Sequence, residues 1–263
     1  MASVLITGCS SGMGLATAIA FARRGDTVFA SMRDLATRRR LDEASDAAGV
    51  EMSVVQLDVC DPTSVDRVTA DLLDRGGLDV VVNNAGVSTL GAIETIDEAE
   101  IRLALDTNVV GPLGVVRRLL PHMRERGSGA IVNVSSVAGT MAAPFTGIYA
   151  ASKHALEAWS EALAAEAAPF GVRVAIVIPG FFRTEILTNE AARNGSGRQP
   201  SPYSDAEAGM RSFMYAGVGN GGDPETVAQA VVAAATEPGP LRHVVGEGVR
   251  DLLVGARATW DAV

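Results

Sequence analysis

Short apolar runs alternate along this chain with longer stretches in which apolar residues recur every three or four positions. The runs are rich in β-branched residues and predict strands at residues 3–7, 27–32, 51–57, 78–82, 130–134, 172–178 and 241–245. The periodic stretches predict helices at residues 15–24 and 97–126, from residue 149 past residue 163, and at 223–236. This alternation predicts an α/β fold with a doubly wound parallel sheet. Ligands bind such sheets at the carboxyl ends of the strands, so candidate functional residues are expected there.

A long segment, residues 181–222, interrupts the alternation. It contains the polar sequence NGSGRQPSPYSD between aromatic residues, and insertions of this kind often form lids over substrates. The aromatic residues either line an apolar pocket or anchor the loop, and we favour the pocket. The chain shows no second domain, repeat or linker, so residues 1–263 are expected to form a single domain.

A glycine-rich loop follows the first predicted strand. It reads TGCSSGMG, contains Gly8, Gly12 and Gly14, and leads into the first predicted helix. Such a loop allows backbone N–H groups to approach a pyrophosphate, and the helix N-terminus favours its negative charge. The spacing differs from the standard Gly-x-Gly-x-x-Gly fingerprint. We interpret the loop as a phosphate-binding site, with a simple strand–helix turn as the alternative.

The end of the second predicted strand indicates which dinucleotide binds. An acid at this place holds the ribose 2′-hydroxyl of NAD(H), whereas an arginine accommodates the 2′-phosphate of NADP(H). Here Met32 is followed by Arg33 and Asp34. Because a guanidinium bonds two phosphate oxygens at once, we predict NADP(H) as the cofactor and consider NAD(H) less favoured. Asp34 is expected either to repel the phosphate or to pair with Arg38.

Polar residues also follow the third and fourth predicted strands. Asp58 comes after the third strand and either accepts a hydrogen bond from an adenine amino group or caps a turn; we favour the adenine contact. The fourth strand ends in the sequence NNAG, at residues 83–86. Two asparagines and a glycine suit a tight turn, and they also suit a backbone that a ligand approaches closely.

The helix predicted over residues 97–126 contains Gly111 and Pro112 in its interior. A proline there should break the hydrogen-bond ladder locally or kink the helix. Asn108 lies just before this irregularity. It is either an ordinary local hydrogen-bonding residue or, beside freed backbone groups, a residue that holds a water molecule.

Tyr149 and Lys153 are four residues apart in the sequence TGIYAASK. On a helix this spacing puts both side chains on one face. A nearby ammonium favours the phenolate form of a tyrosine, so the pair is suited to exchange a proton with an alcohol or a carbonyl oxygen. Lys153 is the only lysine of the chain. The alternative is a surface lysine on an alanine-rich helix.

Composition excludes several functions. The formal net charge of −9 disfavours binding to nucleic acid or to an anionic membrane. No apolar run approaches the ~20 residues of a membrane span, and no charged region precedes the first strand as in a signal peptide. Cys9 and Cys60 fit neither a metal site nor a disulfide framework, which favours a cytoplasmic protein without a metal. Cys9 lies in the glycine loop, where it is either sensitive to thiol reagents or, as we favour, inert.

Together these residues resemble the short-chain dehydrogenase/reductase family over nearly the whole chain. The matches are, in order, TGCSSGMG, NNAG, Asn108, Ser136, Tyr149 with Lys153, and the sequence PGFFRT at residues 179–184. The resemblance implies a single Rossmann-type sheet of about seven parallel strands with helices on both faces, in a homodimer or homotetramer. It also implies an oxidoreductase that transfers hydride between NADP(H) and a small carbonyl or secondary alcohol substrate, which we expect to be apolar.

The resemblance assigns a role to each matched residue. Tyr149 donates or accepts the proton, Ser136 hydrogen-bonds the substrate oxygen, and Lys153 holds the nicotinamide ribose and lowers the pKa of Tyr149. Asn108 positions a water molecule that links Lys153 to solvent. The residues expected to contact the cofactor are Gly8, Ser10, Ser11, Gly12, Met13, Gly14, Arg33, Asp58, Val59, Asn84, Ala85, Gly86, Tyr149, Lys153, Pro179, Gly180, Phe182 and Thr184.

Two other functions are compatible with the same scaffold. One is a cofactor-sensing protein that binds NADP(H) without turnover, and the other is an epimerase or dehydratase that recycles its cofactor. The intact set of Ser136, Tyr149 and Lys153 favours the oxidoreductase. Substrate specificity is expected to depend on the lid and on residues 140–145, whose shapes the sequence does not define.

Overall fold

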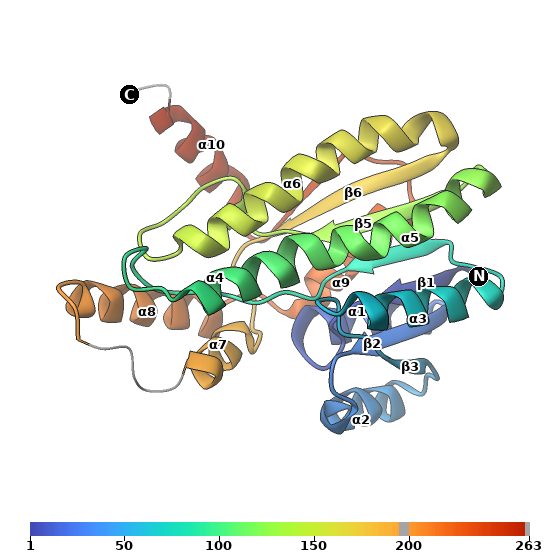
Figure 1. Ribbon diagram of the computed structural model, residues 1–263, viewed down its shortest axis with the longest axis horizontal. Helices are drawn as coiled ribbons and strands as arrows, with labels where there is room; N and C mark the ends of the chain where they lie inside the picture. The colour runs from blue at the N-terminus through green and yellow to red at the C-terminus, as the bar shows by residue number, and fades with distance from the viewer. Residues whose placement is uncertain (195–199, 261–263) are drawn as a thin grey trace.

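The computed structural model describes residues 1–194 and 200–260, and a seven-stranded parallel sheet forms its centre (Figure 1). The strands are β1 (Ser3–Ile6), β2 (Thr27–Met32), β3 (Ser53–Gln56), β4 (Val80–Asn83), β5 (Gly129–Val134), β6 (Val172–Pro179) and β7 (Arg242–Val245). They lie in the order β3-β2-β1-β4-β5-β6-β7, and every neighbouring pair is parallel. The predicted Rossmann-type α/β fold is confirmed.

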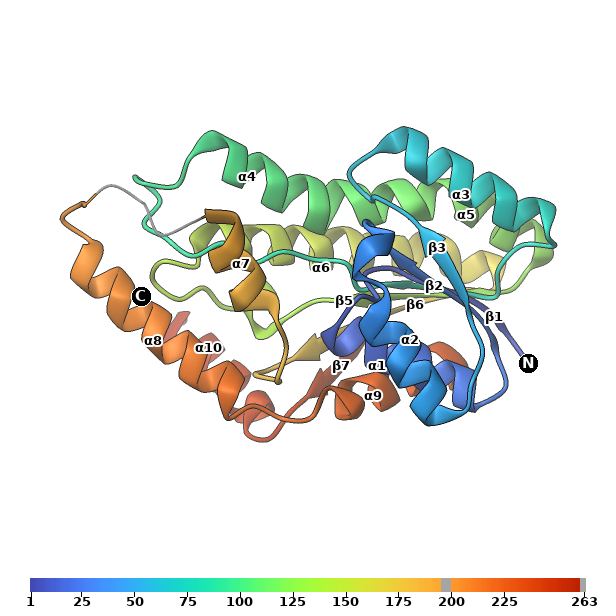
Figure 2. The same cartoon turned by 90° about the horizontal axis from the view of Figure 1, so that it is seen from below.

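Helices cover both faces of this sheet (Figure 2). The α-helices of the described residues are α1 (Gly12–Arg23), α2 (Arg39–Ala48), α3 (Pro62–Asp74), α4 (Glu98–Leu105), α5 (Gly111–Arg126), α6 (Gly147–Ala167), α7 (Ile186–Asn194), α8 (Ser204–Gly219), α9 (Pro224–Thr236) and α10 (Val249–Trp260). Alternate residues of β1 point to opposite faces: Val4 and Ile6 pack with α1 and α9, whereas Leu5 packs with α3 and α5. The strands are apolar on both faces because both faces are covered.

The strand order reverses between β1 and β4. β1 is followed by β2 and β3 on one side, and β4 begins the series on the other side. The backbone N–H of Thr7, just after β1, donates to the carbonyl oxygen of Val82 in β4 at 3.0 Å. The carboxyl ends of the two central strands therefore meet, at the point where a ligand crevice is expected in sheets of this kind.

The helix predicted over residues 97–126 is divided into two. A π-helical segment, Asp106–Val110, separates α4 from α5, and it contains Asn108. Pro112 lies in the first turn of α5, where a proline needs no N–H donor. The predicted irregularity beside Asn108 is confirmed, and it takes the form of a widened helical turn.

The segment 181–222 contains two helices, α7 and α8, which lie at the carboxyl end of the sheet together with α10 (Figures 1 and 2). A bridge between Phe182 and Gly222 joins the two ends of the segment. Residues 195–199 of the predicted lid lie outside the described residues. α7, α8 and α10 were not predicted from the sequence, because glycine and polar residues obscure their periodicity. In the described ranges, no helix has the length and apolar character needed to cross a bilayer.

Candidate active site

The glycine loop connects β1 to α1 and packs closely against the residues that follow β4. Gly8 has a φ of +75°, and a Cβ atom on it would lie 2.8 Å from the Cα of Ala85. A Cβ on Gly14 would lie 2.2 Å from the carbonyl oxygen of Gly8. Ser11, the N-cap residue of α1, makes no capping hydrogen bond through its side chain. The helix N-terminus is therefore not occupied by the Ser11 hydroxyl, which suits the binding of an anion there.

Side-chain hydrogen bonds fix the predicted contact residues after β4 to this loop. The Asn84 Nδ2 donates to the carbonyl oxygens of Thr7 and Gly8 at 2.9 and 3.1 Å. The backbone N–H groups of Asn84 and Ala85 both donate to the Thr7 hydroxyl at 3.0 Å. Thr7 was not among the residues predicted to contact the cofactor, although its place at the end of β1 indicates a role. These bonds hold the two loops together before any ligand arrives.

Asn108 lies in the π-helical segment and is almost completely buried, with 1% of its surface exposed. Its Oδ1 accepts from the N–H of Val87 at 2.8 Å, and its Nδ2 donates to the carbonyl oxygen of Val87 and to the Ser152 hydroxyl, both at 2.9 Å. A Cβ on Gly86 would lie 3.3 Å from the Asn108 Oδ1 and 3.6 Å from the Nζ of Lys153. The structure thus brings Gly86, Asn108 and Lys153 together. The predicted water molecule stays a prediction.

Tyr149 and Lys153 lie on the same face of α6, and the Nζ of Lys153 is 6.0 Å from the centre of the Tyr149 ring. Lys153 is 95% buried, and its Nζ donates to the carbonyl oxygen of Val134, at the end of β5, at 2.9 Å. Ser136 is the second residue after β5, and its side chain lowers the pKa of Tyr149 as a hydrogen-bond partner. The three predicted catalytic residues are therefore adjacent. The alternative of a surface lysine is wrong.

Burial controls the protonation of this group. It raises the pKa of Tyr149 above the ordinary value for a phenol, and the hydrogen bond from Ser136 opposes the rise. Burial also lowers the pKa of Lys153 to about 8, and the carboxylate of Glu157 opposes that change. The expectation that Lys153 would lower the pKa of Tyr149 is wrong for the protein without ligand. The physical reason is that the loss of hydration outweighs the other influences, while the ammonium bonds a carbonyl oxygen instead of the phenol.

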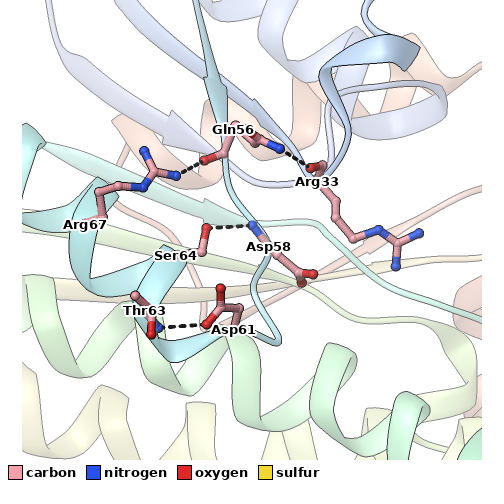
Figure 3. Close-up of a pocket in the computed structure, with 7 residues that line it drawn as sticks. All are labelled: Arg33, Gln56, Asp58, Asp61, Thr63, Ser64 and Arg67. Carbon is pink, nitrogen blue, oxygen red and sulfur yellow. Dashed lines mark hydrogen bonds between the residues drawn. The ribbon is translucent and has the colours of Figure 1, made fainter.

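A polar pocket of about 320 Å³ lies beside the ends of β2 and β3 (Figure 3). Its lining includes Arg33 and Asp58, the two residues predicted to contact the 2′-phosphate and the adenine. It also includes Arg67 from α3, which the sequence analysis missed and which donates to the carbonyl oxygen of Gln56 at 2.9 Å. An oxygen of the Asp58 carboxylate accepts from the N–H of Cys60 at 2.9 Å. The turn-capping interpretation of Asp58 is thus confirmed, while its adenine contact stays a prediction.

Neighbouring residues refine this picture. Asp34 accepts a hydrogen bond from the N–H of Ala36 at 2.9 Å, and Arg38 pairs with Asp42, so the suggested pairing of Asp34 with Arg38 is wrong. Val59 packs against the π-helical region, since a Cβ on Gly111 would lie 2.9 Å from its side chain. Four residues predicted to contact the cofactor lie at the N-terminus of α1 and are half-buried: Ser10, Ser11, Gly12 and Met13.

The residues after β6 extend from the core to the glycine loop. Gly180 donates to the carbonyl oxygen of Val245 at 3.0 Å, beside Pro179. Phe182 packs its side chain into the core, which leaves only its backbone for the predicted cofactor contact. Thr184 reaches the glycine loop, because a Cβ on Gly12 would lie 3.2 Å from its methyl group. Of these four predicted residues, Thr184 thus lies beside the glycine loop, and the cofactor contacts of the other three stay predictions.

Aromatic residues of the lid contact one another. Phe181 and Phe213 meet edge to face with 6.0 Å between ring centres, and Phe145 and Tyr203 do the same at 6.5 Å. Tyr215 donates to the carbonyl oxygen of Leu187 at 3.2 Å, which joins α8 to α7. Tyr215 thus anchors the lid, whereas the apolar pocket predicted for the aromatic residues stays a prediction. Phe145 has a φ of +65°, an uncommon conformation for a bulky residue and one often found near functional sites.

The arrangement of a glycine loop, a π-helical asparagine, and a serine, tyrosine and lysine at the ends of parallel strands matches a known family. The family model for the short chain dehydrogenase matches residues 2–195. The chain belongs to this family. It is accordingly an oxidoreductase.

Individual relatives and structures agree. The human 17-beta-hydroxysteroid dehydrogenase type 1 is 36% identical over 263 residues, which cover 95% of this chain and 79% of that protein. The 3-ketodihydrosphingosine reductase of Bacteroides thetaiotaomicron is 33% identical over 97% of this chain and 91% of its own. The crystal structure of a short-chain dehydrogenase from Streptomyces avermitilis has a TM-score of 0.86 and 40% identity, and the match covers 99% of this chain and 94% of that one.

Two further similar structures contain a nicotinamide cofactor. A short-chain dehydrogenase/reductase from Burkholderia phymatum, in complex with NAD, has a TM-score of 0.86, 25% identity and coverage of 99% of this chain and 94% of its own. A metagenomic short-chain oxidoreductase, in complex with NADP, has a TM-score of 0.72, 26% identity and coverage of 92% and 96%. Both cofactors therefore occur among proteins with this fold.

Proposed function

We propose that this protein is an NADP(H)-dependent oxidoreductase that interconverts a carbonyl and a secondary alcohol on an apolar small molecule. The observation that carries the proposal is the position of Tyr149 and Lys153, on one helix face beside Ser136, at the strand ends that also carry the glycine loop. When bound, the cofactor supplies or accepts the hydride. The residues of the protein bind the cofactor and transfer the proton.

Each side chain has a distinct task in this proposal. Tyr149 transfers the proton to or from the substrate oxygen, and Ser136 donates a hydrogen bond to that oxygen as charge develops on it. Lys153 provides a positive charge next to the phenol and hydrogen-bonds the ribose. Burial raises the pKa of Tyr149, so the phenol carries its proton at neutral pH, as donation to a carbonyl oxygen requires.

The residues around the glycine loop fit a dinucleotide. Gly8 and Gly14 leave no room for a side chain between the loop and Ala85, so backbone groups face the place where a pyrophosphate would lie. Arg33 lines the polar pocket beside β2, and its guanidinium is suited to a 2′-phosphate. This pocket supports NADP(H) over NAD(H).

The apolar substrate class rests on the lid and on the relatives. Phe145, Phe181, Phe213 and Tyr203 form two edge-to-face pairs at the carboxyl end of the sheet. The curated relatives include proteins named for a hydroxysteroid and for 3-ketodihydrosphingosine. We therefore propose a hydrophobic ketone or alcohol as the substrate. A homodimer or homotetramer and a cytoplasmic location stay predictions.

The central test is Tyr149→Phe. The variant should bind NADPH with unchanged affinity, measured by its fluorescence, and lose turnover by about 10²- to 10⁴-fold, because the general acid is absent. Turnover is measured as the absorbance change at 340 nm with a panel of apolar ketones. Tyr215→Phe serves as the matched control, since it removes a hydroxyl from the lid without altering the proposed proton path. Retained turnover in Tyr149→Phe would refute the assignment.

A second test concerns cofactor choice. Arg33→Ala should weaken NADP(H) binding by about 10- to 100-fold and leave NAD(H) binding nearly unchanged, because only NADP(H) carries the 2′-phosphate. Arg39→Ala is the control, since Arg39 is an exposed arginine paired with Glu43. Equal losses for the two cofactors would show that Arg33 does not contact the phosphate.

A further inference from the structure

A buried carboxylate lies one helical turn beyond Lys153 on α6. Glu157 is 95% buried, and its two oxygens have different partners. The hydroxyl of Ser135, at the end of β5, donates to Oε1 at 2.8 Å. The guanidinium of Arg242, in β7, donates from its Nε to Oε2 at 3.2 Å. Tyr149, Lys153 and Glu157 thus follow one another at four-residue intervals along a single face of the helix.

The surrounding structure is shaped to hold this carboxylate. Arg242 also donates to Glu161, one further turn along α6, at 2.9 Å, so the guanidinium bridges two acids of the same helix. A Cβ on Gly139 would lie 2.3 Å from the Glu157 Oε1 and 2.5 Å from the Ser135 Oγ. Only glycine fits there. Burying a carboxylate is costly unless it is paired and hydrogen-bonded, and here both conditions are met.

Glu157 is the charged group that acts on Lys153. Burial lowers the pKa of Lys153 to about 8, and the charge of Glu157 is the opposing influence. The other charged or titratable side chains on α6 and on the elements packed against it are His154, Glu161 and Glu166 on α6, Arg242 on β7, Arg173 on β6, Asp106 in the π-helical segment, and Glu98, Glu100 and Arg102 on α4. None of these acts directly on the pKa of Lys153, and Arg242 is connected to it only through its ion pair with Glu157.

We propose that Glu157 is a positioning residue that keeps Lys153 in its ammonium form, and that Arg242 limits the charge that Lys153 experiences from Glu157. On this face the carboxylate lies one turn after Lys153 and Tyr149 lies one turn before it, so Glu157 stabilises the cation without competing for the phenol. The consequence for turnover rests on the proposed function, whereas the consequence for the protonation of Lys153 does not.

The two halves of the proposal predict opposite shifts. Glu157→Gln removes a negative charge of nearly the same shape, so the pKa of Lys153 should fall by about one unit. Arg242→Gln leaves the charge of Glu157 without its guanidinium, so the pKa of Lys153 should rise by about half a unit. Glu161→Gln changes an exposed carboxylate two turns away and should shift the pKa very little. General damage to the fold would not shift the pKa of Lys153 in opposite directions in Glu157→Gln and Arg242→Gln.

The sole lysine makes the measurement direct. Protein labelled with ¹³Cε-lysine gives a single lysine resonance, which belongs to Lys153, and its shift is followed against pH in the full chain without cofactor. The expected midpoints increase in the order Glu157→Gln, wild type, Arg242→Gln. An unchanged midpoint in Glu157→Gln, or a lowered one in Arg242→Gln, would overturn the proposal. Thermal melting of each variant identifies any that does not fold. If Glu157→Gln does not fold, Glu157→Asp replaces it: this variant keeps the charge but shortens the side chain, so it should lower the midpoint of Lys153 by less.

Steady-state kinetics provide the second readout. Ketone reduction needs the ammonium of Lys153, so its rate should fall as pH rises through the pKa of Lys153, and Glu157→Gln should move this decline to lower pH by about one unit. Shifted NMR midpoints with no shift in the pH–rate profile would mean that the charge of Lys153 does not govern turnover. Shifted midpoints in a protein that shows no turnover at all would contradict the proposed function and leave the role of Glu157 intact.

Discussion

The glycine-loop region and the lid of this protein are joined to the sheet in different ways. Around the glycine loop, the contacts are made by backbone atoms and by two short, shielded side chains, those of Thr7 and Asn84. The glycines allow these parts to approach within van der Waals distance. Such a site has little freedom to change shape, and it is complete before a ligand binds.

The lid is instead joined to the body by long side chains. Glu207 of α8 accepts from the N–H of Ala92 at 2.8 Å and from the hydroxyl of Thr95 at 3.2 Å. Arg193 of α7 donates to the carbonyl oxygen of Ser88 at 2.9 Å, and Tyr203 donates to Glu94 at 2.8 Å. All four contacts lie in the loop between β4 and α4. The difference teaches that the glycine-loop region is fixed by packing against the sheet, whereas the lid, which we propose sets substrate choice, is a separately attached layer.

The largest effect that separates the two regions is expected from paired glycine substitutions. In Gly14→Ala the added methyl group meets the Gly8 carbonyl oxygen at 2.2 Å, so the free energy of unfolding should fall by about 3 kcal/mol and NADPH binding should be lost. In Gly209→Ala, on α8, the methyl group meets nothing within 4 Å, and the helix should gain about 1 kcal/mol. Urea denaturation and NADPH fluorescence measure both. Equal destabilisation of the two variants would contradict this difference.

A smaller effect is expected from the ion pair between the lid helices. Arg211 of α8 pairs with the completely buried Glu190 of α7 at 2.6 Å. Arg211→Gln should lower stability by about 1–2 kcal/mol, a modest value because Arg211 is one-third exposed. The KM for substrate should rise severalfold while the Kd for NADPH stays constant, since the pair lies in the lid. Arg39→Gln is the control, and a parallel loss of NADPH affinity in Arg211→Gln would show that the two regions are coupled.

The smallest effect concerns the two thiols. Cys9 is completely buried in the glycine loop, and burial raises its pKa to about 12. Cys60 is exposed, although partial burial also raises the pKa of its thiol. Iodoacetamide at neutral pH should therefore modify Cys60 slowly and leave Cys9 unmodified, as read by mass spectrometry. Cys60→Ser should show no modification and keep full stability. Labelling of Cys9 in the folded protein would mean that the glycine loop opens.

The parts of the site that depend on neighbours in sequence were predictable. The strand–glycine–helix order and the Tyr149–Lys153 spacing each lie within one short segment, so periodicity and local chemistry were enough to place them. The break near Pro112 was also predictable, but its π-helical form depends on bonds from Asn108 to Val87 and Ser152, which no local pattern contains.

Other features depend on distant partners or on burial. Glu157 and Arg242 are separated by 85 residues, so their pairing becomes visible only when β7 lies beside β6. The direction of the Tyr149 pKa shift was wrong because a sequence does not state how much water a phenol loses on folding. The lid helix α8 was missed for a related reason: it has no buried residue and is held by individual side-chain contacts, which leave little hydrophobic periodicity.

The π-helical turn also changes how the side-chain faces of α4 and α5 are rotated relative to each other. A widened turn accommodates one residue more than an α-helical turn, and each residue rotates the chain by about 100°. Consequently α4 and α5 follow each other in space while their side-chain faces are offset by about that angle. Removing any one residue from Asp106–Val110 would restore a uniform spiral, yet it would turn the asparagine amide away from its partners. At this point a more regular helix and the hydrogen bonds of Asn108 are mutually exclusive.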